Sequence, residues 1–257
     1  MPSAVTNLFR ECGEFTAMAV DTIRAGIRPP YAWREFLQQG WFVASVSILP
    51  ACLVAIPFGA IIALQTGALI RQLGAVSLNG GASVVAVVRE ASPIVTSLII
   101  AGAAGSAICA DLGSRKVKDE IAAMEVMGLS PLQRLVAPRV LAVMWVSILL
   151  NGLVSVVGVA GGYFFAVFAE HGSPGPYFGS FTELAQLPDL LQAEVKAALF
   201  GLVAALIASY KGLTAKGGPK GVGDAVNQSV VFTFMLLFAI NFVATSIYQQ
   251  VIPQRVL

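Results

Sequence analysis

Long apolar runs separated by short polar connections fill most of this chain. The runs cover residues 41–72, 82–112, 132–169, 188–212 and 223–250. Each reaches the ~20 residues that a helix needs to cross ~30 Å of hydrocarbon. The runs show no period-2 alternation and are too long for the strands of a membrane barrel. We therefore predict an all-α integral membrane protein with about five transmembrane helices.

The first forty residues follow a different pattern, that of an amphipathic helix. Apolar residues recur there at steps of three and four: Val5, Leu8, Cys12, Phe15, Ala19 and Ile23. This spacing predicts a helix that lies in the membrane interface, within an interfacial region at residues 1–40. A peripheral helix packed on the other helices fits the same pattern. We expect Pro29 and Pro30 to end the helix, and residues 33–39 to lead into the first span.

Composition agrees with a membrane protein and gives no sign of a soluble domain. The chain of 257 residues is 57% hydrophobic and 12% charged, with a mean hydropathy of +0.80. Such values lie outside the range of soluble globular domains, and the short connections leave one domain, residues 1–257. The cysteines at 12, 52 and 109 indicate no disulfide framework, and the single histidine, His171, has no neighbour with which to share a metal. No nucleic-acid partner is expected.

The distribution of basic residues predicts the orientation. If the N-terminus is cytoplasmic, most Lys and Arg residues fall on the cytoplasmic side, while Arg71 and Arg255 fall outside. We therefore expect a cytoplasmic N-terminus and an external C-terminus. The outer connection that contains "HGSPGPYFGS" is expected to form a packed cap.

The chain has no recognisable nucleotide-binding or catalytic motif. Its glycine-rich inner connection, "KGLTAKGGPKGVGDA", lacks the G-x-x-x-x-G-K-[ST] pattern and follows no predicted strand. If ATP drives this protein, the ATPase must be another chain. A membrane-embedded enzyme is a weaker alternative, because no nucleophile and base are paired in the sequence.

Charged residues interrupt two of the apolar runs. Arg89 and Glu90 lie in the second run, and Glu194 and Lys196 lie in the fourth. Such groups cost about 2.5–3.5 kcal/mol each at mid-helix, so they usually find partners. Glu90 and Lys196 each lie about two turns after their helix enters from outside. We therefore predict a Glu90–Lys196 pair; snorkelling of both side chains to the outer headgroups is the alternative.

Other features of the spans indicate a cavity and close helix packing. Pro93 is expected to kink the second span and free a backbone carbonyl. Gln65, Thr66 and Asn241 could line the same cavity or form hydrogen bonds between helices. Small residues recur at four-residue steps, which allows helices to approach closely: Gly59, Ala63 and Gly67; Gly102 and Ser106; Gly158 and Gly162.

A charged, helix-prone segment at residues 115–129 separates the second and third runs. We expect Gly113 to end one helix and Ser114 to cap a new helix of three to four turns, which Gly128 and Pro131 stop. The residues proposed to form its functional surface are Asp119, Glu120, Ile121, Met124, Glu125, Met127 and Gly128. Adaptable methionines beside acidic groups suit docking to a partner. An amphipathic connector resting on the inner ends of the helices is the alternative.

The region around this segment resembles a known protein family. "ASPIVTSLIIAGAAGSAICADLGSRKVKDEIAAMEVMGLSPLQRLVAPRVLA" is similar to the signature region of the MlaE/YrbE permeases, the membrane subunits of ABC transporters that move lipids with MCE proteins. The resemblance covers residues 33–248 and includes "YKGLTAKGGPKGVGDAV".

The resemblance implies specific roles and partners. Residues 119–128 match the coupling helix that docks into the ATPase, and Glu90 and Lys196 match the family's intramembrane Glu and Lys. The family implies a permease dimer, an ATPase dimer that binds ATP and Mg²⁺, and an MCE hexamer on the outer side. Gln65, Leu69 and Ile94 fall in the region that lines its lipid cavity.

The chain departs from the common family pattern at two places. Ala103 stands where many members have arginine, and Val226, Asn227 and Gln228 replace a threonine pair. These features resemble the first of two YrbE paralogues encoded with actinobacterial Mce systems, which implies a heterodimer with a second YrbE-type permease.

The expected function is that of a non-catalytic permease subunit in the bacterial inner membrane, without a cofactor of its own. It would move lipids or fatty acids, with import favoured, and a separate ATPase would drive it. An ion-coupled secondary transporter of an apolar substrate is the alternative, motivated by Glu90, Glu194 and Lys196. The absence of an internal sequence repeat argues against it.

Overall fold

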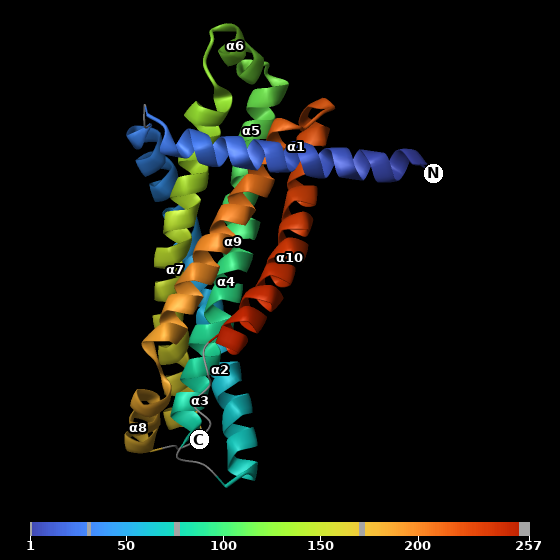
Figure 1. Cartoon of the computed structure of the whole chain (residues 1–257). Coiled ribbons are helices and arrows are strands. Elements are labelled where there is room, and N and C mark those ends of the chain that lie inside the picture. Colours follow the sequence, from blue (N-terminus) through green and yellow to red (C-terminus); the bar gives the residue numbers. More distant parts are fainter. Residues whose placement is uncertain (1, 30–31, 75–77, 170–172, 252–257) are drawn as a thin grey trace. The chain divides into compact units, whose positions relative to one another are not determined.

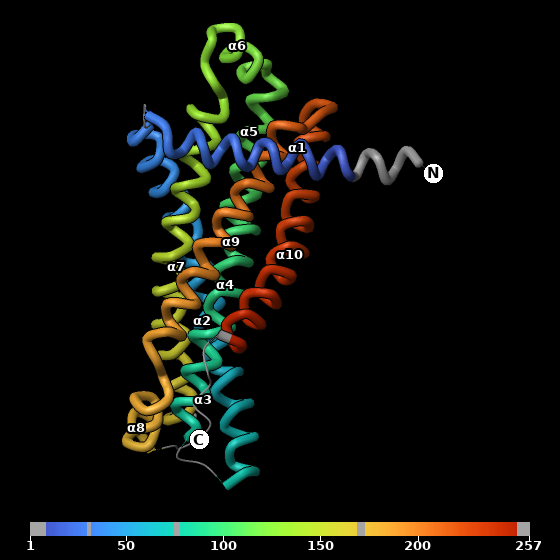
Figure 2. Tube along the Cα trace, viewed as in Figure 1, coloured from blue at the N-terminus to red at the C-terminus, as the bar shows by residue number. Residues whose placement is uncertain are grey.

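The computed structural model describes residues 2–29, 32–74, 78–169 and 173–251, and every regular element in these ranges is a helix (Figures 1 and 2). Five helical segments are long and apolar enough to cross a membrane: Trp33–Gln72, Asn79–Val117, Leu132–Phe168, Leu187–Leu213 and Gly218–Gln250. The all-α membrane class is therefore confirmed. Residues 33–39 belong to the first of these helices, α2 (Trp33–Gln72).

The chain divides into two compact units, each assembled from three stretches. Unit 1 comprises Met1–Val43, Ile100–Trp145 and Gly201–Leu237. Unit 2 comprises Ala44–Ile99, Val146–Phe200 and Phe238–Leu257.

Unit 1 contains the N-terminal helix, α1 (Pro2–Ile27), which lies crosswise to the start of α7 (Ala137–Phe164) in Figure 1. Phe15 of α1 packs edge-on against Tyr210 of α9 (Leu187–Leu213), with 5.6 Å between ring centroids. Thr22 is buried. The helix therefore packs against other helices of unit 1, and its place in the membrane interface stays a prediction. The side chains of Val5 and Leu8 lie outside the described residues, as does Pro30.

Unit 1 also contains the segment around α6 (Glu120–Val126). Its other helices are the start of α2, η3 (Ile100–Gly105), α5 (Ser106–Val117), η4 (Leu132–Val136), the start of α7, the end of α9 and the first part of α10 (Gly218–Val251). The predicted small-residue motif at Gly102 makes no close helix contact among the described residues, because a Cβ added there would meet no neighbouring atom within 4 Å.

Unit 2 is held together by close contact between two helices. A Cβ added at Gly59 of α2 would overlap the carbonyl oxygen of Gly158 in α7. One added at Gly162 would lie 3.1 Å from the carbonyl oxygen of Gly59. Backbones this close leave no room for side chains, so the predicted small-residue packing is confirmed for α2 and α7.

The outer connection forms a packed cap within unit 2. Its helix, α8 (Pro174–Leu184), covers α3 (Asn79–Ala86), where Gly81 N donates to Ser180 Oγ at 3.0 Å. Tyr177 packs against Val84, and burial, followed by the nearby Tyr163, raises the pKa of Tyr177 to about 12. The phenol is therefore neutral at physiological pH. His171, in the same connection, lies outside the described residues.

Candidate functional site

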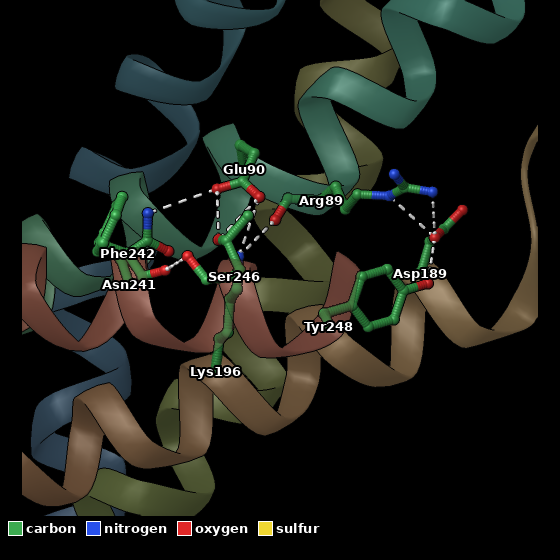
Figure 3. A network of polar contacts seen from close by, with 9 residues as sticks. Arg89, Glu90, Asp189, Lys196, Asn241, Phe242, Ser246 and Tyr248 are labelled. Carbon is green, nitrogen blue, oxygen red and sulfur yellow. Dashed lines mark hydrogen bonds and ion pairs between the residues drawn. The ribbon is translucent and has the colours of Figure 1, made fainter. Parts of the chain in front are cut away.

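A π-helical turn positions the two charges of the second span. Arg89 and Glu90 lie in η2 (Val87–Ala91), between α3 and α4 (Ser92–Ile99). The backbone N–H of Ser92 donates to the carbonyl of Val87, five residues earlier, which is the π-helical spacing. Arg89 and Glu90 both face α9 and α10 from this turn, and each contacts different residues of these two helices (Figure 3).

Lys196 of α9 lies at the centre of the site, with only 2% of its side chain exposed (Figure 3). Its Nζ lies 3.1 Å from Glu90 Oε1 and donates to Thr245 Oγ1 of α10 at 2.8 Å. A third donation goes to the backbone carbonyl of Arg89 at 3.3 Å. An ammonium has three N–H groups, so all three are used. The structure thus brings Glu90 and Lys196 together.

Pro93 explains why a backbone carbonyl is available to Lys196. Proline has no N–H, so Pro93 cannot donate to Arg89, which lies four residues earlier. The carbonyl of Arg89 accepts from Lys196 instead. Pro93 thereby leaves the Arg89 carbonyl free to be one of the three acceptors that stabilise the buried lysine.

Glu90 is far more open than its partner, because 37% of its side chain is exposed. Thr245 Oγ1 donates to Glu90 Oε1 at 3.2 Å, and Asn241 Nδ2 donates to Oε2 at 3.4 Å. Phe242, beside them on α10, is exposed and labelled in Figure 3. The carboxylate is therefore a polar point next to an apolar surface, and it can accept a further hydrogen bond.

A second ion pair adjoins the first and was not foreseen from the sequence. Arg89 Nη2 lies 2.7 Å from Asp189 Oδ1, and Tyr248 donates to the same oxygen at 2.6 Å. The Arg89 guanidinium also lies 5.4 Å from the centre of the Tyr248 ring. Asp189 lies at the start of the predicted fourth span and occupies the first turn of α9. Its position at a helix N-terminus was the available signal.

Other polar residues of the spans have partners elsewhere or lie exposed. Glu194 Oε1 accepts from Asn151 Nδ2 at 3.2 Å, on α7. Thr66 shares a 2.7 Å hydrogen bond with Ser83, so it serves the predicted alternative of bonding between helices. Gln65 and Leu69 are exposed on α2, and Ile94 is partly buried on α4. Their place in a cavity remains a prediction.

The segment predicted as a docking helix is shorter than expected. Gly113 and Ser114 lie inside α5, and Ser114 Oγ donates to the carbonyl of Asp111 at 2.9 Å, so the predicted stop and cap are wrong. The helix that follows, α6, has only seven residues, Glu120–Val126. Asp119 separates the two helices because its backbone is left-handed, with φ 59°. The predicted length of three to four turns is therefore also wrong.

Gly128 ends α6 as the sequence indicated. It has φ +74°, and its N–H donates to the carbonyl of Glu125 at 3.0 Å. Leu129 N donates to the carbonyl of Met124 at 2.9 Å, which completes a Schellman motif. This closure fixes the direction in which the chain leaves α6.

The surface of α6 combines apolar and acidic groups. Ile121 is buried and anchors the helix, and Met124 is partly buried. Val126 and Met127 are 89% and 66% exposed. Asp119, Glu120 and Glu125 are also exposed. Exposed apolar residues and carboxylates on one short helix are typical of a docking surface, and Val126 was not among the residues predicted for it.

The described residues hold no group of three His, Cys, Asp or Glu side chains that could bind a metal. Their polar contacts instead tie helices together, as in η2, α9 and α10. Polar side chains therefore join helices, and α6 presents a surface that a partner can recognise.

Comparison with known proteins gives a consistent result. Residues 36–247 match the family described as Permease MlaE. A probable ABC transporter permease protein of Synechocystis is 32% identical over 209 residues, which cover 81% of this chain and 80% of that protein. One from Rickettsia bellii is 28% identical over 244 residues, covering 95% and 94%. The intermembrane phospholipid transport system permease protein MlaE of Haemophilus influenzae is 27% identical over 206 residues, covering 78% and 77%.

Proposed function

Because this chain belongs to the MlaE permease family, we propose that it is the membrane subunit of an ABC-type transporter that moves lipids across the cell envelope. It supplies the path for the substrate, and a separate ATPase supplies the energy. The relative from Haemophilus influenzae is named for phospholipid transport, which supports a lipid substrate with a polar headgroup and acyl chains. Import of lipids or fatty acids is the favoured direction.

The observation that carries the proposal is the surface of α6. Val126 and Met127 expose apolar area at the end of a short helix that Gly128 closes. Such area is costly in water and is stabilised when a partner covers it. We assign the ATPase as that partner, with Glu125 and its neighbouring acids orienting the contact.

The Glu90–Lys196 network has a supporting role in this proposal. It joins η2, α9 and α10, all of which belong to proposed spanning segments. The exposed side of Glu90 gives the apolar path one acceptor for a headgroup. Gln65, Leu69 and Ile94 are proposed to line the same path.

The proposal includes partners beyond the ATPase. An ATPase dimer would bind ATP and Mg²⁺, a second YrbE-type permease would complete the pore, and an MCE hexamer would stand on the outer side. The membrane is the bacterial inner membrane, with the N-terminus cytoplasmic and the C-terminus outside.

The test is to purify the native complex in mild detergent and identify its subunits and bound lipid. We expect an ATPase, a second permease, an MCE protein and a phospholipid. A stable permease that never carries an ATPase would contradict the proposal. Transport that persists after removal of the ATPase would favour ion-coupled secondary transport.

A substitution in α6 gives a sharper test. Glu125→Arg reverses a charge at the docking surface and should lower lipid transport per ATP about tenfold, since a like-charge contact weakens docking. Glu183→Arg, at an exposed glutamate of α8, is the matched control. Equal transport per ATP in the two variants would remove α6 from the mechanism.

A further inference from the structure

A buried arginine in unit 1 has no role in the sites described so far. Arg139 lies in the first turn of α7, and only 2% of its side chain is exposed. Its Nη2 lies 2.6 Å from Asp111 Oδ2 of α5 and 3.8 Å from Glu35 Oε1 of α2. Burying a guanidinium is costly unless its partners are well placed, so this position needs an explanation.

The contacts continue from Asp111 to the docking helix. Arg115 Nε lies 3.1 Å from Asp111 Oδ2, and Arg115 Nη1 lies 3.5 Å from Glu120 Oε2. Glu120 is the first residue of α6. Five alternating charges therefore connect the start of α2 to the start of α6, and all lie within unit 1.

The network is not fully satisfied at its buried end. Arg139 Nε and Nη1 have no hydrogen-bond partner among the described residues. Asp111 Oδ2 serves both Arg139 and Arg115. Because Asp111 contacts both arginines, a displacement of Glu120 that moves Arg115 would also disturb the contact between Asp111 and Arg139. The unpaired Nε and Nη1 of Arg139 are donors to which Asp111 could then turn, and a relay would require such a second arrangement.

We propose that Arg139 is a positioning residue that links α6 to α2 and α7, so that displacement of α6 is passed to two spanning helices through Asp111. This inference rests on the proposed function, in which the ATPase is the partner that displaces α6. Both carboxylates, which belong to different helices, contact the same nitrogen, Nη2. This nitrogen lies one bond further from Cα than the Nζ of a lysine, so a lysine at position 139 would fall short of the contact.

The first experiment uses the permease alone and measures hydrogen exchange in α6. Arg139→Lys keeps the charge but shortens the side chain by one bond, and we expect the α6 amides to exchange roughly threefold faster than in the wild type. Arg134→Lys, at an exposed arginine of η4, is the matched control and should leave the exchange unchanged. Equal exchange in the two variants would overturn the inference.

A second experiment avoids the buried position and decides the question if Arg139→Lys fails to fold. Glu35 and Glu120 lie at opposite ends of the network, and both are partly exposed. In the double-mutant cycle of Glu35→Gln and Glu120→Gln, the effects on α6 exchange should not add. Additive effects would show that nothing is passed between the two ends.

The third experiment uses the assembled complex. Arg139→Lys should lower lipid moved per ATP about tenfold while leaving the KM for ATP unchanged, because nucleotide binding lies in another chain. Unchanged transport per ATP would overturn the relay. If the wild-type permease binds no ATPase, the proposed function fails, and the two exchange experiments still decide whether Arg139 connects α6 to α2.

Discussion

At the scale of single residues, Lys196 and Glu90 differ in burial, and this difference sets what each substitution costs. Glu90→Gln leaves the buried ammonium of Lys196 without its counter-charge, and should lower the free energy of unfolding by about 3 kcal/mol. Lys196→Met should cost less, because Glu90 is partly exposed and keeps Thr245 and Asn241 as donors. Thermal unfolding of the purified permease in detergent measures both.

The charge-reversal pair provides the control for that prediction. Glu90→Lys combined with Lys196→Glu should regain part of the stability that each single change loses. If the pair regains nothing, or if Lys196→Met costs more than Glu90→Gln, the burial argument is wrong.

A second prediction at this scale concerns close helix packing. Gly59→Ala pushes a methyl group onto the carbonyl of Gly158, so the backbones of α2 and α7 must separate, at a cost of about 2 kcal/mol. Gly102→Ala meets open space and should change stability by less than about 1 kcal/mol. Similar melting temperatures for the two variants would contradict the packing described here.

The sequence predicted one ion pair of the site and missed its neighbour. The pairing of Glu90 with Lys196 could be predicted, because both residues lie about two turns into runs that begin on the same side. Asp189 was missed because a helix N-terminus beside a Pro- and Gly-rich connection is hard to place from one sequence. The contribution of Thr245 had no signal, since an isolated threonine in an apolar helix is ordinary.

At the scale of elements, α6 depends on the residue that closes it. Gly128→Ala places a side chain at φ +74°, which costs about 1 kcal/mol. The C-terminal turn of α6 should fray, and the amides of Gly128 and Leu129 should exchange faster. Hydrogen exchange followed by mass spectrometry measures this.

Gly13→Ala is the control for that substitution. Gly13 lies in α1 with no atom within 4 Å of an added Cβ. Alanine should stabilise that helix slightly and leave α6 unchanged. Protection of α6 that is the same in Gly128→Ala as in the wild type would show that its Schellman motif does not hold it.

The length of α6 shows where a sequence pattern is insufficient. Residues 115–126 contain good helix formers, so their pattern predicts one continuous helix. The break at Asp119 comes from a left-handed backbone, which aspartate tolerates better than most residues. The stop at Gly128 could be predicted, because glycine readily adopts the left-handed backbone that ends many helices.

At the scale of the whole molecule, the proposed orientation, with a cytoplasmic N-terminus and an external C-terminus, makes a prediction about access from the two sides of the membrane. In a chain whose native cysteines are replaced, Val126→Cys should react with an impermeant thiol reagent only from the cytoplasm. Phe178→Cys, on exposed α8, should react only from outside. Labelling of intact cells and of inverted vesicles distinguishes the two, and the reverse pattern would invert the assigned orientation.

The membrane class and number of spans could be predicted from the sequence because apolar length is a direct physical requirement of the bilayer. The division into two compact units could not. Each unit combines stretches from the beginning, middle and end of the chain, and no local pattern records that combination.

The π-helical turn at Val87–Ala91 makes the second span sensitive to the deletion of a residue. A π-turn is an α-helix that carries one additional residue, so it shifts the angular phase of everything after it by about 100°. Deleting one residue there would restore α-helical winding at this turn and rotate Pro93 and the rest of α4 away from their present neighbours. The register of α4 relative to α3 is therefore set by an inserted residue at the turn that carries Arg89 and Glu90.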